Sequence, residues 1–167
     1  MSERHKVFIV DDQAGEIRSE IRRIKRRGYD VELATNERDA RFGLEQVAAD
    51  LSRYAAGIFD IMVATVDLET LLEMGEGVDL AKEVFEPSID TGIRLCRYVR
   101  EELGLDASVF PIAALSVRDD DELKQALERL GVPLYERGVD DTSERSIMRF
   151  IERYLPERRH SDAETSG

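Results

Sequence analysis

The strongest constraint on the fold is a regular alternation of apolar runs and amphipathic stretches along the 167-residue chain. The apolar runs are short and rich in β-branched residues, which indicates strands; they lie at 6–10, 29–35, 56–62, 109–116 and 132–135. The other stretches place apolar residues on one helical stripe; they lie at 14–27, 36–53, 94–103, 119–130 and 143–155. This repeated alternation predicts parallel βαβ units in one open, doubly wound, five-stranded α/β sheet.

Two segments do not follow this alternation. Residues 63–90 separate the third predicted strand from its helix, and their apolar residues have helical spacing interrupted by Gly75 and Gly77. They predict an inserted helix–turn–helix piece between strand 3 and helix 3. Residues 157–167 are polar and aperiodic, which predicts a disordered tail. We therefore expect one domain over residues 1–156, with an inserted segment at 63–90.

Composition narrows the class of protein. A net charge of −12 argues against sequence-independent binding of nucleic acid, because such binding requires clustered Lys and Arg. The single cysteine, Cys96, excludes an intramolecular disulfide. No leader-like segment follows Met1, and no apolar run reaches membrane-spanning length. These observations predict a cytoplasmic protein without direct nucleic-acid binding or membrane insertion.

Polar residues stand at the ends of three predicted strands. Asp11 and Asp12 follow the first strand, Asp60 lies near the end of the third, and Ser116 ends the fourth. Because the carboxyl ends of parallel strands meet at one rim of the sheet, we expect three carboxylates and a hydroxyl there. Carboxylates packed together repel one another, and hard oxygen donors suit Mg²⁺. The rim is therefore a candidate magnesium site.

These residues resemble the receiver domains of response regulators. The Phe-Asp-Ile-Met context of Asp60 is similar to the D-[IL]-x-M of that family, and Asp-Thr-Gly at 90–92 resembles the D-G before its third helix. The resemblance covers residues 6–155 apart from the insertion. It implies a flavodoxin-like receiver fold, bound Mg²⁺, and a phosphoryl group received from a histidine kinase or a phosphotransfer protein.

The resemblance also implies a role for each site residue. Asp60 would accept the phosphoryl group. Asp12 would bind Mg²⁺ directly, Asp11 directly or through water, and Met62 through its backbone carbonyl. Ser116 would donate a hydrogen bond to a phosphoryl oxygen. The only chemistry implied is self-phosphorylation from a phosphodonor, so the protein is not expected to be an enzyme that turns over a substrate.

The chain departs from the receiver pattern at the end of the fifth strand, where the family has a lysine. Its own lysines are all elsewhere, at Lys6, Lys25, Lys82 and Lys124. Counting forward from Ser116 without a gap puts Gly138 at that place, and allowing one deletion puts Arg137 there. We favour Arg137, because a guanidinium can pair with phosphate bidentately.

Two further departures lie beside Asp60. The small residue that the family has after its Ser or Thr is Val117, which predicts narrower access to Asp60. The proline that usually follows the Asp60-Ile-Met motif is missing, and the insertion begins in its place. The insertion would then emerge beside the site, as a lid or as a docking surface for a partner.

The sequence thus predicts a single-domain response regulator that signals to a downstream protein through protein contacts. One alternative is a degenerate receiver that is never phosphorylated and serves as an interaction module. A second is a phosphatase-like enzyme with the insertion as a cap. Such aspartate-based phosphatases carry D-x-D after the first strand, whereas this chain has Asp11-Asp12-Gln13.

Overall fold

The computed structural model describes residues 5–13, 15–62, 89–117 and 121–158. The insertion expected at 63–90 lies outside the described residues except for its last two, which begin a helix. The tail expected at 157–167 lies outside them except for residues 157 and 158.

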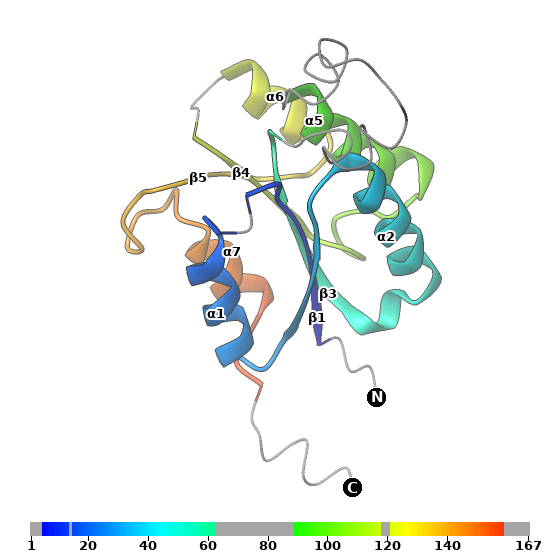
Figure 1. Ribbon diagram of the computed structural model, residues 1–167. Coiled ribbons are helices and arrows are strands. Elements are labelled where there is room, and N and C mark those ends of the chain that lie inside the picture. Colours follow the sequence, from blue (N-terminus) through cyan, green and yellow to red (C-terminus); the bar gives the residue numbers. More distant parts are fainter. Residues whose placement is uncertain (1–4, 14, 63–88, 118–120, 159–167) are drawn as a thin grey trace, which may run out of the picture.

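One five-stranded parallel sheet forms the centre of the molecule, with the strand order β2-β1-β3-β4-β5 (Figure 1). The strands are β1 (Lys6–Val10), β2 (Asp30–Ala34), β3 (Tyr54–Asp60), β4 (Ile112–Ser116) and β5 (Leu134–Glu136). The doubly wound sheet predicted from the sequence is confirmed, and its order is that of the flavodoxin-like fold.

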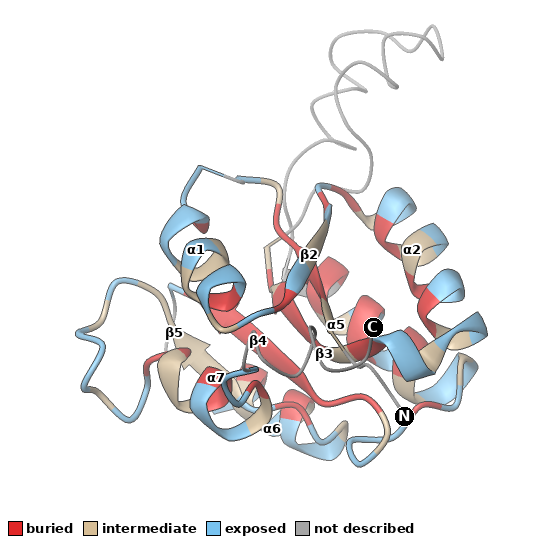
Figure 2. Cartoon of the chain, turned by 90° about the horizontal axis from the view of Figure 1, so that it is seen from below, coloured by how far each residue is buried: buried red, intermediate tan, exposed pale blue. Residues whose placement is uncertain are grey.

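Helices cover both faces of the sheet (Figure 1). They are α1 (Arg18–Arg26), α2 (Glu37–Ala49), α5 (Ile89–Arg97), α6 (Asp121–Arg129) and α7 (Met148–Tyr154). Apolar residues of α1 and α7 pack in one core layer, and those of α2, α5 and α6 pack in the other. Figure 2 shows the buried residues along the strands and on the helix faces turned toward them. None of the described helices is both long enough and apolar enough to cross a membrane.

The apolar runs are continuous because the central strands are buried on both faces. In β1, Phe8 and Val10 belong to the core layer under α2, and Val7 and Ile9 belong to the layer under α1 and α7. All four are at most 3% exposed. This double burial explains why the sequence does not alternate between apolar and polar residues there.

Several element boundaries differ from the predicted ones for local reasons. The last helix was expected from residue 143, but residues 143–147 form turns in which the Ser143 and Ser146 hydroxyls accept hydrogen bonds from the Arg145 and Met148 N–H groups (3.1 and 3.2 Å). Such bonds compete with helical ones. Asn36 caps α2 as expected, since its side chain accepts a hydrogen bond from the Asp39 N–H (2.8 Å).

Helix α5 begins unusually close to the end of β3. The Gly92 N–H donates a hydrogen bond to the Ile61 carbonyl (3.1 Å). A Cβ at Gly92 would lie 2.4 Å from that carbonyl oxygen and 2.6 Å from the Ile61 Cα, so this approach requires glycine. Beyond Arg97 the helix widens into a π-helical turn, Tyr98–Glu102.

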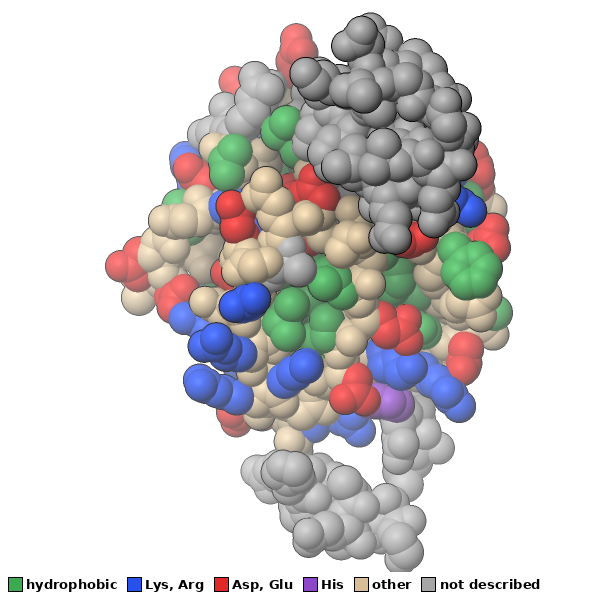
Figure 3. Space-filling view, in the orientation of Figure 1, with side chains coloured by type: hydrophobic (Ala, Val, Ile, Leu, Met, Phe, Trp, Pro, Cys, Tyr) green, Lys and Arg blue, Asp and Glu red, His purple; other side chains and the backbone are tan. Residues whose placement is uncertain are grey.

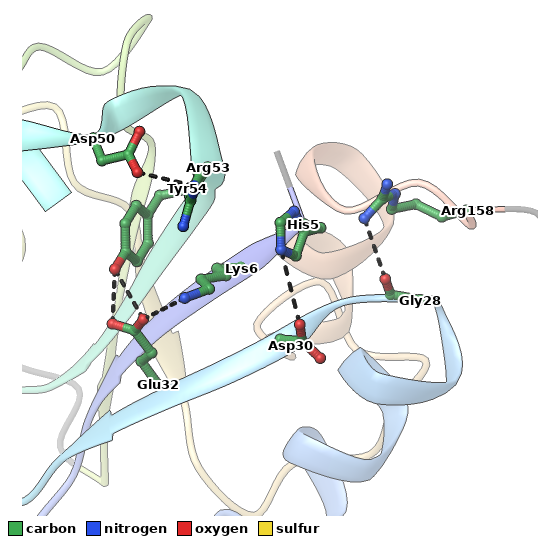
Figure 4. Close-up of polar contacts among 9 residues, drawn as sticks. All are labelled: His5, Lys6, Gly28, Asp30, Glu32, Asp50, Arg53, Tyr54 and Arg158. Carbon is green, nitrogen blue, oxygen red and sulfur yellow. Dashed lines mark hydrogen bonds and ion pairs between the residues drawn. The ribbon is translucent and has the colours of Figure 1, made fainter. Parts of the chain in front are cut away.

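The amino end of the sheet holds a compact set of polar contacts. The Tyr54 hydroxyl donates to the Glu32 carboxylate (2.9 and 2.8 Å), and the Lys6 ammonium lies 2.9 Å from the same carboxylate (Figure 4). The three residues come from three adjacent strands, so the cluster ties the edge of the sheet to its centre. It joins strands and leaves no carboxylate without a partner.

Arg100 makes a second set of contacts near that end. From the π-helical turn, its half-buried guanidinium donates hydrogen bonds to backbone carbonyls in the segments that lead into β4 and β5: those of Leu130 (2.7 Å), Leu105 (2.9 Å), Phe110 (2.8 Å) and Gly131 (3.4 Å). Burial lowers the pKa of Arg100. The Arg100 side chain therefore connects the π-helical turn to the segments before β4 and β5. All of its acceptors are neutral carbonyl groups.

Candidate functional site

The carboxyl ends of the central strands bring the predicted acidic residues together. Asp11 directly follows β1, Asp12 comes next, and Asp60 is the last residue of β3. One carboxylate oxygen from each of these three residues lies within 4.8 Å of the others. A group of oxygen donors this compact has the size and chemistry to hold a small, hard cation such as Mg²⁺.

Two of these carboxylates are deeply placed and similarly held. Asp11 is fully buried, and the side chain of Asp60 is 12% exposed. The Gln13 N–H donates to Asp11 Oδ1 (2.8 Å), and the Met62 N–H donates to Asp60 Oδ1 (3.2 Å). In both residues a backbone N–H two positions onward thus engages Oδ1, while Oδ2 faces Arg137.

Arg137 enters the site from the end of β5. Its N–H donates to the Ser116 carbonyl (2.9 Å), which continues the pairing of β5 with β4. The chain then turns at Gly138, whose φ is +78°. The guanidinium Nη2 donates to Asp11 Oδ2 and lies 3.5 Å from Asp60 Oδ2. Of the two positions that counting allowed, Arg137 is thus the one whose side chain reaches the carboxylates.

The charges of Asp11 and Asp60 are not balanced by Arg137 alone, because two carboxylates face one guanidinium. Burial raises the pKa of Asp60 to about 7, the positive charge of Arg137 opposes this rise, and the negative charge of Asp11 adds to it. A bound divalent cation would favour the ionised form of such a carboxyl group.

The remaining predicted residues surround this cluster. Ser116 ends β4, is 4% exposed, and lies beside β3, where Asp60 pairs with Leu115. Met62 follows Asp60 by two residues and is partly buried. Val117 is 67% exposed and lines a cavity together with Arg137, and the narrower access to Asp60 expected from it stays a prediction.

A cavity of about 300 Å³ opens beside the site, between the start of α1 and the segment that follows β5. Its polar lining is mostly acidic and includes Glu16, Glu20, Glu136 and Asp141, together with Arg137. Burial acts to lower the pKa of Arg137, but the hydrogen bond to Asp11 and the negative charges of Asp11, Asp60 and, last, Glu16 raise it above its ordinary value. We did not single out Glu16 from the sequence, because its distance from Arg137 along the chain gives no sign of this proximity.

Comparison with known proteins shows which solved structures have a similar fold. No protein-family model and no curated protein matches the amino-acid sequence. Solved structures match it well. The chemotaxis response regulator CheY4 of Vibrio cholerae has 20% identity and a TM-score of 0.58, with 90% of this chain and 98% of that chain covered. A response regulator receiver protein from Pseudomonas putida has 22% identity and a TM-score of 0.58, with 91% and 96% covered.

A third match is the receiver domain of the Francisella response regulator 1452. It has 18% identity and a TM-score of 0.58, with 90% of this chain and 93% of that domain covered. All three identities are low, so these likenesses establish the fold alone.

Proposed function

We propose that this chain, which has the flavodoxin-like fold of response regulator receivers, accepts a phosphoryl group on Asp60 in a Mg²⁺-dependent reaction. The observation that carries the proposal is the cluster of Asp11, Asp12 and Asp60 oxygens at the carboxyl end of the sheet, with the Arg137 guanidinium reaching it from β5. A carboxylate nucleophile, oxygen donors for a cation, and a cation able to pair with phosphate thus share one rim.

The donor set fits Mg²⁺, since carboxylate oxygens are the ligands that this ion prefers. Asp12 and Asp60 would hold it, together with Asp11 and the backbone carbonyl of Met62. Bound there, Mg²⁺ would compensate for the negative charge of the carboxylates and withdraw electron density from the incoming phosphoryl oxygens.

The side chains then divide the work of phosphoryl transfer. An Asp60 carboxylate oxygen attacks phosphorus, the bond from phosphorus to the donor atom breaks, and an aspartyl phosphate forms. The Ser116 hydroxyl and the Arg137 guanidinium donate hydrogen bonds to the transferred phosphoryl group. The positive charge of the guanidinium also compensates for part of the negative charge of the phosphoryl group.

The exposed side of α1, the first helix after Asp11 and Asp12, suggests the character of the phosphodonor. Helix α1 exposes four cations, Arg18, Arg22, Lys25 and Arg26, for which the described residues supply no hydrogen bond or ion pair. Figure 3 shows Lys and Arg side chains gathered over this part of a protein whose net charge is −12. We propose a histidine kinase or phosphotransfer protein with an acidic docking surface, and a cytoplasmic location follows from such a partner.

One observation favours the alternative of an interaction module that is never phosphorylated. Arg137, which we propose for the place of the lysine expected in receivers, pairs with Asp11, a candidate metal ligand. If this pairing were permanent, neither the cation nor the phosphoryl group would find room, and the protein would signal by contact alone.

Intact mass distinguishes these functions. The full chain is incubated with acetyl phosphate, with Mg²⁺ or with EDTA, alongside Asp60→Ala and the control Asp30→Ala, which removes an exposed carboxylate of β2. We expect the wild type and Asp30→Ala to gain one phosphoryl group with Mg²⁺ only, and Asp60→Ala to gain none. No gain in the wild type, repeated with a panel of histidine kinases, would favour the interaction module. A gain in Asp60→Ala would place the acceptor elsewhere.

A further inference from the structure

One guanidinium nitrogen stands where a cation would have to bind. Arg137 Nη2 contacts both Asp11 Oδ2 and Asp60 Oδ2. The Arg137 side chain is only 15% exposed, and the Asp11 side chain is not exposed at all. The contact is therefore shielded from water, so it is stronger than a surface ion pair.

The backbone holds Arg137 in this position. Its N–H is bonded to the Ser116 carbonyl, and the preceding N–H, of Glu136, is bonded to the Arg145 carbonyl (both 2.9 Å). The side chain thus leaves a fixed point at the end of β5. Two buried carboxylates without a cation would be costly, so in the metal-free protein Arg137 stabilises the pair.

The other oxygens of the two carboxylates are already engaged. Asp11 Oδ1 accepts the Gln13 N–H, and Asp60 Oδ1 accepts the Met62 N–H. Each Oδ2 atom faces Arg137 Nη2, so a divalent cation that binds both residues through these two atoms takes the place of the guanidinium. The cation and the guanidinium cannot occupy the space between these atoms together.

We infer that Arg137 is a built-in competitor of the divalent cation and sets the metal affinity of the site. This inference rests on the proposed Mg²⁺ site. Metal binding displaces the guanidinium from Asp11 and Asp60, and the released guanidinium becomes available to a phosphoryl group. The site is thus closed by its own arginine when metal is scarce and opened when metal is abundant.

Calorimetric titration of the full chain with Mg²⁺, without phosphodonor, tests the competition. We compare the wild type with Arg137→Gln and with the control Arg94→Gln, which makes the same charge change in a surface ion pair with Glu37. We expect Arg137→Gln to bind Mg²⁺ about tenfold more tightly, because a positive charge beside the site is gone. Arg94→Gln should stay within about twofold of the wild type. Equal or weaker binding by Arg137→Gln would overturn the inference.

A second variant and a second readout cover the case in which Arg137→Gln folds poorly. Arg137→Lys keeps the charge but lacks the planar fork, so its affinity should lie between those of the wild type and Arg137→Gln. Without metal both variants should melt below the wild type, and Mg²⁺ should raise their melting temperatures by more. Equal Mg²⁺ shifts in all three proteins would contradict the competition.

These outcomes separate the inference from the proposed function. Tighter Mg²⁺ binding by Arg137→Gln without phosphorylation of the wild type would support the competition and reject the phosphoacceptor role. Phosphorylation of Asp60 in the wild type, with an unchanged Mg²⁺ affinity in Arg137→Gln, would support the phosphoacceptor role and reject the competition.

Discussion

Two partly buried arginines lie near opposite ends of the sheet and have different partners. Arg100, near the amino end, donates its hydrogen bonds to backbone carbonyls. Arg137, at the carboxyl end, contacts the carboxylates of Asp11 and Asp60. The first arrangement is complete, since neutral acceptors satisfy the cation and require nothing further. The second leaves an excess of negative charge, which a further cation can bind.

The carboxylates of the two ends show the same difference. At the amino end Glu32 is matched by Lys6 and by the Tyr54 hydroxyl. At the carboxyl end burial raises the pKa of Asp60 to about 7, although the Arg137 guanidinium and the Met62 N–H both oppose the effect. Polar groups that satisfy one another stabilise a fold, whereas groups left in excess are available for binding and chemistry. The comparison therefore predicts metal-independent effects at the amino end and metal-dependent effects at the carboxyl end.

The largest effect on stability is expected at the carboxyl end, from Gly92→Ala. Helix propensity alone would favour alanine by about 1 kcal/mol. The added Cβ, however, would meet backbone atoms of Ile61 at 2.4 to 2.8 Å, so we expect a net loss of about 3 kcal/mol in the free energy of unfolding. Urea denaturation followed by circular dichroism measures it. Gly15→Ala, with no heavy atom within 4 Å of its Cβ, is the control. Stabilisation by Gly92→Ala would mean that α5 does not approach β3 this closely.

The next largest effect is expected at the amino end, from Arg100→Ala. Removing the guanidinium leaves carbonyls in the segments before β4 and β5 without their donors, so the free energy of unfolding should fall by about 2 kcal/mol. The same denaturation experiment, with and without Mg²⁺, should give the same loss. Arg97→Ala, on the exposed side of α5, is the control. A loss that depends on Mg²⁺ would remove the distinction between the two ends.

A smaller effect is expected from Tyr54→Phe. The lost hydrogen bond to Glu32 should lower the free energy of unfolding by about 1 kcal/mol at pH 8. Burial, together with the bond to Glu32, raises the pKa of Tyr54 above its ordinary value of 10.0. The folded state therefore holds this proton more tightly than the unfolded state, so stability present below pH 10 is lost as the pH rises further.

The urea midpoints of wild type and Tyr54→Phe should consequently converge as the pH rises from 8 to 11. A difference that stays constant over this range would mean that the Tyr54 proton is held no more tightly in the folded protein than in the unfolded one.

The sheet and the position of the acidic rim could be predicted from the sequence. Continuous apolar runs indicate parallel strands, and parallel strands end at one rim whatever their exact length, so Asp11, Asp60 and Ser116 had to meet there. Small errors in strand boundaries do not affect this argument. The third strand, for example, was expected at 56–62 with Asp60 near its end, and it spans Tyr54–Asp60 with Asp60 as its last residue.

Other features depend on tertiary geometry that no local pattern carries. Counting residues left Arg137 and Gly138 open, and the choice between them follows from the bond of Arg137 to the Ser116 carbonyl and from the turn at Gly138. The carbonyl partners of Arg100 come from two separate segments, one before β4 and one before β5. Helical periodicity around 143–147 was misleading, because serine hydroxyls bond the backbone there.

The most direct test of the difference between the two ends is the change in melting temperature caused by Mg²⁺ in wild type, Asp12→Asn and Glu32→Gln. Both variants replace one carboxylate by an amide, one at each end of the sheet. With Mg²⁺ in large excess over its dissociation constant, we predict a rise of about 4 °C in wild type and Glu32→Gln and none in Asp12→Asn. An equal rise in Asp12→Asn, or its loss in Glu32→Gln, would contradict a cation site at the carboxyl end.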